Sequence, residues 1–231
     1  MTFELLHDTT PSRADMAKGK LLEAGLQCFA SRGLDGVTIR EIARLSGQNS
    51  ASITYYFGGK EGLYRAVLDA VMRFFKTHFL TAEQHYRTAA ARGPITREIA
   101  ITLLKGVQRA FALGVLTNAR ASQFAMLMVR EQNQPTEAFD SLYQDTIEPL
   151  HRMISTLLAH ITGDEPDSPQ AALRAHTLIG QLQSFVMARE TVLRRMGWDG
   201  FTPQRAALVA DMLAENLDIF VAGLGPKSGK E

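Results

Sequence analysis

The sequence predicts an all-α protein of about nine helices, and three observations support this fold class. Apolar residues recur at helical spacing, as where Leu22, Leu26 and Phe29 follow one another at i, i+4 and i+7. Hydroxyl residues and prolines that suit a first helical turn mark several helix starts. Sustained alternation with hairpin turns, which is typical of strands, is not found in any segment.

The first third of the sequence contains four expected helices separated by glycines. Thr38 and Glu41 form a Thr-x-x-Glu capping box that opens the second helix, and Asn49 or Ser50 can cap the third. Gly33, Gly47 and the pair Gly58-Gly59 end the first three helices. The fourth helix starts at Lys60-Glu61 and runs to about His85.

Later helix starts are marked by a small or hydroxyl residue next to a proline. The positions are Gly93-Pro94, Pro135-Thr136, Ser168-Pro169 and Thr202-Pro203. We expect a head domain over residues 12–62 and a larger domain over residues 63–225.

Composition limits the possible environments. The net charge is only +1, and Cys28 is the single cysteine, which excludes an intrachain disulfide and suits a reducing cytoplasm. The N-terminus lacks the pattern of a signal peptide, and no uninterrupted apolar run is long enough to cross a bilayer. We therefore expect a cytoplasmic protein without a membrane partner.

The two short helices before Lys60 have the pattern of a helix-turn-helix. Ala43 is small enough for the helices to approach, and Gly47 permits the positive φ of the turn. No carboxylate lies between Gln48 and Lys60, so the surface of the second short helix would not repel DNA. Small hydroxyls and tyrosines can approach bases and phosphates. The alternatives are an exposed helix of low charge, or two tyrosines that cover the core.

The stretch "GVTIREIARLSGQNSASITYYFGGKEGLYRAVLDAV" resembles the DNA-binding domain of the TetR family of transcriptional regulators, and the resemblance runs from about Ala17 to Val71. Residues 96–224 resemble the CecR-like or YbiH-like branch through "VREQNQPTEAF", "IEPLHRMI" and "HTLIGQLQSFVMARETVLRRMGW". The resemblance implies a helix-turn-helix head on a helical ligand-binding and dimerisation domain.

The resemblance also assigns DNA contacts. Thr38 and Arg40 correspond to positions that touch a phosphate or a base, and Lys60 to a lysine that meets a phosphate at a helix N-terminus. On the recognition helix, Ser50, Ser52 and Thr54 would face the major groove, while Tyr55 and Tyr56 would grip the backbone. This chain departs from the pattern in two ways: Gly59 replaces a small polar residue, and the recognition helix has no arginine or lysine.

The last two long segments are the expected dimer interface. The final helix has Val209, Leu213 and Phe220 on one line and Leu208, Met212 and Ile219 on another. In the family such helices form a four-helix bundle between subunits. The expected interface residues are Leu178, Leu182, Val209, Leu213 and Phe220, although a fully internal helix would show the same pattern.

The middle of the chain is expected to hold a small-molecule effector, because methionines and aromatics are mixed with polar groups there. Arg189 continues the apolar stripe of Leu178, Leu182 and Phe185, where a charge needs a partner. The alternative to an effector site is a set of structural ion pairs such as Glu190 with Arg194. The candidate effector residues are Gln123, Met126, Arg130, Glu131, His176, Gln181, Phe185 and Arg189.

The expected function is a ligand-responsive repressor that binds a palindromic double-stranded DNA operator as a homodimer and is released by a small molecule. The motifs of common enzymes are absent, and the six histidines show no zinc spacing, so we expect no catalysis, cofactor or metal. Two alternatives are an all-α small-molecule-binding protein or enzyme with a vestigial helix-turn-helix, and a non-specific architectural DNA binder. The helix-turn-helix argues against the first and the low charge against the second.

Overall fold

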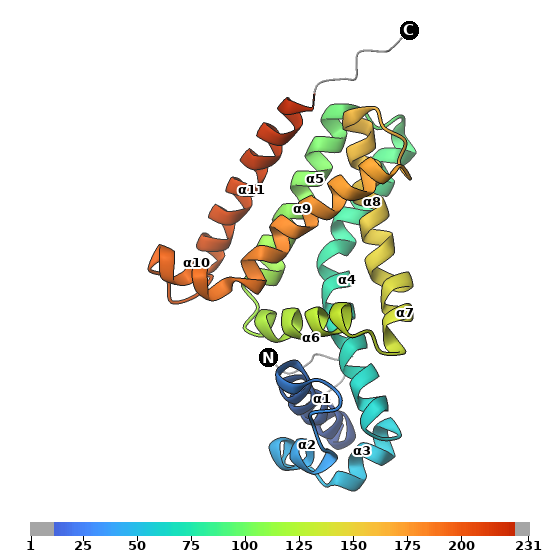
Figure 1. The fold of residues 1–231 in the computed structure, drawn as a ribbon, viewed down its shortest axis with the longest axis vertical. Coiled ribbons are helices and arrows are strands. Elements are labelled where there is room, and N and C mark those ends of the chain that lie inside the picture. Colours follow the sequence, from blue (N-terminus) through green and yellow to red (C-terminus); the bar gives the residue numbers. More distant parts are fainter. Residues whose placement is uncertain (1–11, 225–231) are drawn as a thin grey trace. The chain divides into compact units, whose positions relative to one another are not determined.

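The computed structural model describes residues 12–224, which form helices throughout and contain no strand within that range (Figure 1). The α-helices are α1 (Arg13–Arg32), α2 (Ile39–Ser46), α3 (Ser50–Phe57), α4 (Lys60–Arg92), α5 (Arg97–Phe111), α6 (Ala121–Asn133), α7 (Ala138–Leu142), α8 (Glu148–Thr162), α9 (Pro169–Met187), α10 (Arg189–Met196) and α11 (Pro203–Gly223). Two π-helical segments, η1 (Ala112–Leu116) and η2 (Tyr143–Ile147), continue α5 and α7. The predicted all-α class is confirmed.

The chain divides into two compact units. Of the described residues, unit 1 contains residues 12–74 together with Ser122–Leu142, and unit 2 contains Phe75–Ala121 together with residues 143–224. The structural division therefore differs from the expected boundary between residues 62 and 63. It gives unit 1 the first part of α4, most of α6 and all of α7.

The predicted helix signals match the structure at most N-termini. The side chains of Thr38, Asn49, Ser168 and Thr202 each accept a hydrogen bond from a backbone N–H in the first turn of their helix. The helix expected at Gly93-Pro94 begins later, at Arg97, and α4 extends beyond the expected His85. Two helices were missed as separate elements: α6, which no proline marks, and α10, which a break at Ala188 separates from α9.

Unit 1 is built around the apolar faces of α1 to α4. Leu21, Phe29, Ile42 and Ile53 are fully buried, and the ring of Phe29 meets that of Tyr64 edge-on at 5.0 Å between centroids. Burying side chains of this size supplies most of the driving force for docking α3 against α1 and α2. The helices of the head are therefore held by their apolar sides, and their polar sides remain outward.

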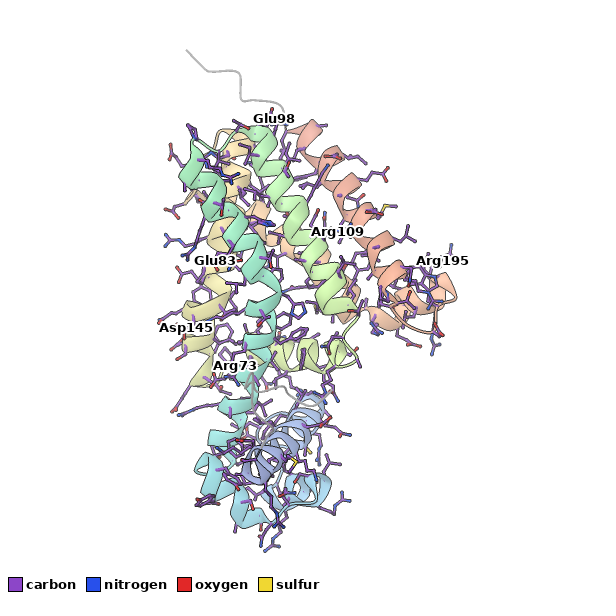
Figure 2. All side chains as sticks on the ribbon, turned by 180° about the vertical axis from the view of Figure 1, so that it is seen from behind. Arg73, Glu83, Glu98, Arg109, Asp145 and Arg195 are labelled. Carbon is purple, nitrogen blue, oxygen red and sulfur yellow. The ribbon has the colours of Figure 1, made fainter. Side chains whose placement is uncertain are left out.

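Unit 2 is a helical bundle in which α5, α8, α9 and α11 pack around one core (Figure 1). Leu104, Ile154, Leu158 and Leu178 are among its buried residues. Helices α5 and α11 are antiparallel, as shown by ion pairs from Lys105 to Asp218 and from Arg109 to Asp211 with N–O distances of 2.7 and 3.6 Å. Arg109 is labelled on α5 in Figure 2.

One stretch of unit 2, Arg97–Leu116, is long and apolar enough to cross a membrane when judged by length and composition alone. It consists of α5 and η1. Ala100, Leu104 and Val107 within it are at most 1% exposed, because they face the other helices of the bundle. A core helix passes the same test, and this stretch has the contacts of one.

The guanidinium of Arg97 joins the ends of two helices in unit 2. It donates to the backbone carbonyl of Ile161 in α8 at 2.6 Å and to that of Val221 in α11 at 2.7 Å. Terminal carbonyls lack partners inside their own helices and carry the negative end of the helix dipole. Arg97→Met is therefore expected to lower the free energy of unfolding by about 2–3 kcal/mol. Urea unfolding measures this, with Arg92→Met at an exposed position as the control that should change little.

Candidate nucleic-acid interface

The turn between α2 and α3 has the backbone geometry of a tight helix-turn-helix. Gly47 ends α2 in the left-handed conformation with φ 66° and ψ 24°, where a side chain would be strained. The N–H of Gln48 then donates to the carbonyl of Ala43 at 3.0 Å. The side chain of Asn49 accepts from the N–H of Ala51 at 3.0 Å and opens α3. The chain direction is thus fixed on both sides of the turn.

The outward line of α3 consists of Ala51, Thr54 and Tyr55, which are exposed and spaced at i, i+3 and i+4. Ile53 is fully buried on the opposite side. Ser50 and Ser52, which were expected to face outward with Thr54, are half-buried at the flanks. Sequence reasoning missed Ala51 because it selected hydroxyl groups, although the spacing relative to Thr54 and Tyr55 marks the same face.

Aromatic rings and cations surround the end of α3. Tyr55 is 82% exposed, and its ring meets that of Tyr56 edge-on at 5.0 Å. The Nζ of Lys18 in α1 lies 5.4 Å from the centre of the Tyr56 ring, which was not foreseen from the sequence. Lys60 is the first residue of α4, where the unpaired backbone N–H groups of a long helix also favour an anion.

Helix α2 presents arginines, while its acidic residue is neutralised within the head. Arg40 and Arg44 are exposed. The carboxylate of Glu41 binds Arg32 at 2.8 Å and accepts from the backbone N–H and hydroxyl of Thr38 at 2.8 and 2.9 Å. Arg32 first, and Thr38 next, lower the pKa of Glu41 to about 2. The hydroxyl of Thr38, an expected DNA contact, is thus engaged in the capping box.

The eight candidate effector residues do not form one group. Gln123, Met126, Arg130 and Glu131 lie on α6 and belong to unit 1. His176, Gln181 and Phe185 lie on α9, and Arg189 begins α10; all four belong to unit 2. Met126, His176 and Gln181 are exposed, whereas Glu131 is buried.

Arg130 binds the end of α1. Its Nε donates to the carbonyl of Ala30 at 3.0 Å, and a terminal nitrogen donates to the carbonyl of Ser31 at 2.5 Å. These carbonyls lie in the last turn of α1, where a cation complements the helix dipole. Arg130 therefore fastens α6 to α1, which gives it a structural partner in place of the expected effector.

Glu131 is 1% exposed and receives three hydrogen bonds inside unit 1. The hydroxyl of Tyr64 in α4 donates to one carboxylate oxygen, and the N–H and hydroxyl of Thr136 donate to the other at 3.3 and 3.1 Å. Burial, followed by the bond to Glu131, raises the pKa of Tyr64. The carboxylate is a buried structural acceptor, so its assignment to an effector is corrected.

Arg189 does not continue the stripe of Leu178, Leu182 and Phe185, because α9 ends at Met187 and a new helix begins. Its guanidinium donates to the carbonyl of Leu116 at 3.3 Å and lies 4.8 Å from the centre of the Phe201 ring. Neighbouring Glu190 pairs with Arg194 at 2.6 Å, as the alternative of simple ion pairs predicted. The helical register used for Arg189 was wrong.

The expected dimer stripe is mostly the core-facing side of its helices. Leu178, Leu182, Val209 and Leu213 are at most 5% exposed within a single chain, and of the expected interface residues only Phe220 is partly exposed. An apolar pattern on two sides does not tell which side faces inward. The exposed large apolar residues of α9 and α11 are Leu173, Met187, Leu208, Met212 and Ile219.

His176 stacks on His151, with ring centroids 6.0 Å apart. Burial, and then the charge of His176, lowers the pKa of His151 below its ordinary 6.5. The folded chain then binds fewer protons than the unfolded chain, so stability should fall as the pH drops through 6.5. Between pH 7.5 and 5.5, the melting temperature of His151→Gln is expected to fall less than that of the parent. His160→Gln, an exposed position on the same helix, should keep the parental profile in the same melts.

Comparison with known proteins places this geometry in a family. Residues 21–67 match the model "Bacterial regulatory proteins, tetR family", and residues 100–224 match "HTH-type transcriptional dual regulator CecR, C-terminal domain". The HTH-type transcriptional dual regulator CecR of Shigella flexneri is 33% identical over 94% of this chain and 96% of its own length. The regulator RutR of Escherichia coli strain K12 is 42% identical over 26% of this chain and 29% of its own.

Two solved structures share the fold at low identity. AibR in complex with isovaleryl coenzyme A and operator DNA has a TM-score of 0.61 at 16% identity, covering 87% of this chain and 97% of AibR. A TetR-like regulator from Rhodococcus sp. RHA1 has a TM-score of 0.53 at 20% identity, covering 93% and 100%. With both family models and a full-length relative in agreement, the chain belongs to the TetR family of bacterial transcriptional regulators, in its CecR-type branch.

Proposed function

We propose that this chain is a homodimeric, cytoplasmic repressor whose two heads bind the half-sites of a pseudo-palindromic operator until a small molecule releases them. TetR-family regulators bind operator DNA as dimers and respond to small-molecule effectors. The observation that carries the proposal is the outward face of α3, where Ala51, Thr54 and Tyr55 project without any carboxylate. Such a face fits the major groove.

The residues of the head divide into two roles. Thr54 lies on the outward line of α3 and Arg40 is exposed on α2; both would read bases, with the guanidinium of Arg40 suited to guanine. The methyl group of Ala51 can contact the methyl of thymine. Tyr55, Tyr56 and Lys60 would bind phosphates, which hold the head in register without reading sequence. Ser50 and Ser52 would contribute from the flanks.

Dimerisation would bring two heads to one duplex. The large apolar side chains exposed on α9 and α11, among them Leu208, Met212 and Ile219, are disfavoured in water. Burying these side chains against a second copy gives a two-fold dimer with two half-sites. The recognition helices must then reach major grooves about 34–36 Å apart. An effector that prefers another separation of the heads weakens operator binding by its differential affinity.

The relatives support regulation rather than catalysis. The Shigella flexneri relative is named a dual regulator, and RutR of Escherichia coli is named a transcriptional regulator as well. We therefore propose no enzymatic activity, metal or cofactor for this chain. Repression is the simpler mode for a dimer that covers a promoter, and the dual role of the relative makes activation at a second promoter the alternative.

Binding to DNA from upstream of the chain's own gene tests the proposal. Fluorescence anisotropy should show a complex of one dimer per site that survives excess unrelated competitor DNA, because base contacts add to phosphate contacts. A footprint should cover a pseudo-palindrome. Equal affinity for operator and competitor would indicate an architectural DNA binder, and no binding to either would leave a small-molecule-binding protein with a vestigial head.

A further inference from the structure

Gln108 is a buried polar side chain whose carboxamide is unpaired within the described residues 12–224. It lies on α5 with an exposed fraction of 0%. Neither its Nε2 nor its Oε1 has a hydrogen-bond partner among the residues that the structure describes. Burying an amide without hydrogen bonds is costly, and folded proteins pair nearly all such groups. The exception calls for a group that would pair with both atoms.

The surroundings of Gln108 on α5 are apolar. Leu104, Val107 and Phe111 on the same helix are buried with it. The antiparallel stretch of α11 between Asp211 and Asp218 contributes Leu213 and Leu217 to the interior. The charged neighbours of Gln108 on α5 already have partners. Lys105 and Arg109 form ion pairs with carboxylates of α11 in partly or largely exposed positions.

The helix changes geometry one turn after Gln108. From Ala112 to Leu116 the backbone forms the π-helical segment η1. A Cβ atom at Gly114 would overlap the ring of His78, so α4 packs tightly on this segment. The carbonyl at its end, on Leu116, accepts from Arg189. Single π turns within α-helices are rare and are frequent at functional sites.

We propose that the carboxamide of Gln108 is a contact group for the effector, and that the effector is uncharged, largely apolar and carries a donor next to an acceptor. This inference rests on the proposed ligand response. A lactam or urea presents an N–H beside a C=O and satisfies both atoms of Gln108 in one pair of hydrogen bonds, whereas an ether or ketone accepts from Nε2 and leaves Oε1 unpaired. A charged ligand would be buried among leucines without a counter-ion.

ε-Caprolactam and N-methylcaprolactam are matched probes for this pairing, because methylation removes the donor and keeps the ring and the acceptor. Titration of the full chain by saturation-transfer NMR should give a Kd of about 1 mM for ε-caprolactam, as expected for a ligand of this size. N-methylcaprolactam should bind about tenfold more weakly, since the Oε1 of Gln108 stays unpaired. Hexanoate, which is charged, should not bind at this site.

Variants complete the test. Gln108→Met keeps the length of the side chain and removes both polar atoms, and Gln108→Leu is a second variant of similar volume. Both should raise the melting temperature by a few degrees, because an unpaired buried amide is removed. Both should weaken ε-caprolactam about tenfold and abolish its preference over N-methylcaprolactam. Gln84→Met, the same change at an exposed position of α4, should bind like the parent.

The outcomes separate this inference from the proposed function. Equal affinity of parent and Gln108→Met for ε-caprolactam, no preference of the parent for the unmethylated lactam, or no saturable binding at tens of millimolar would each overturn the role of Gln108. Operator anisotropy on the same preparations is the second readout. Operator binding without lactam binding would contradict only the effector assignment. Lactam binding without operator binding would contradict only the regulatory function.

Discussion

Tyr55→Glu is expected to weaken operator binding at least about 100-fold while leaving the melting temperature unchanged. Tyr55 is 82% exposed, so the fold of the head does not depend on its side chain. The substitution places a carboxylate on the outward line of α3, opposite the phosphates of the duplex. A dimer carries it twice, so a loss of about tenfold for each head multiplies to the expected effect.

Two further variants determine what the loss means. Tyr55→Phe keeps the edge-on contact with Tyr56 and removes only the hydroxyl, so a loss of a few fold is expected. Tyr143→Glu makes the same change at a tyrosine of η2 in unit 2 and should retain operator affinity. Anisotropy titrations at fixed salt measure all three. If Tyr55→Glu binds operator like the parent, α3 does not enter the major groove.

The sequence was sufficient for local structure in the head. The capping box at Thr38, the left-handed Gly47 and the cap at Asn49 each depend on residues within a few positions, and all three are present in the structure. The face of α3 was predicted less well, because residue chemistry was weighed above spacing. Ala51 was omitted for its plain side chain although it lies on the same line as Thr54 and Tyr55.

Long-range pairings could not be derived from one sequence. Tyr64 and Glu131 are 67 positions apart, and Arg130 lies 100 positions from Ala30. Arg130 and Glu131 were therefore predicted to be pocket residues, because the residues of α1 and α4 that bind them cannot be identified from the sequence of α6 alone. The break at Ala188 also left no signal, since neither a proline nor a glycine marks it, and it moved Arg189 off its presumed stripe.

Burial of the dimer stripe shows a different limit. Both lines of α11 are apolar, and composition alone gives no reason to place Val209 and Leu213 inside and Leu208 and Met212 outside. The packing of α11 against α5 decides it, because the side with Val209 and Leu213 is buried in the core. The exposed ion pairs of Asp211 and Asp218 with α5 agree with this rotation. We therefore propose the side that remains exposed as the line that faces a partner.

The second large effect is expected at Glu131, where α6 is joined to the head within unit 1. Glu131→Ala removes the acceptor of the buried Tyr64 hydroxyl and of Thr136, and leaves a cavity beside them. Leaving such groups unpaired should lower the free energy of unfolding by about 3–5 kcal/mol. Glu131→Gln keeps one acceptor oxygen and should lose roughly 1–2 kcal/mol.

Urea unfolding followed by two probes locates the damage. Trp198 is the only tryptophan and lies in unit 2, so its fluorescence reports that unit, whereas far-UV circular dichroism reports both. Glu131→Ala should shift the circular dichroism transition to lower urea than the fluorescence transition, because unit 1 unfolds first.

Glu137→Ala is the matched control. It removes an exposed ion pair with Arg65 in the same unit and should change stability by less than about 1 kcal/mol. If Glu131→Ala and Glu137→Ala unfold at the same urea concentration, Glu131 does not hold α6 to the head. The contact of Arg130 with α1 would then have to do so alone.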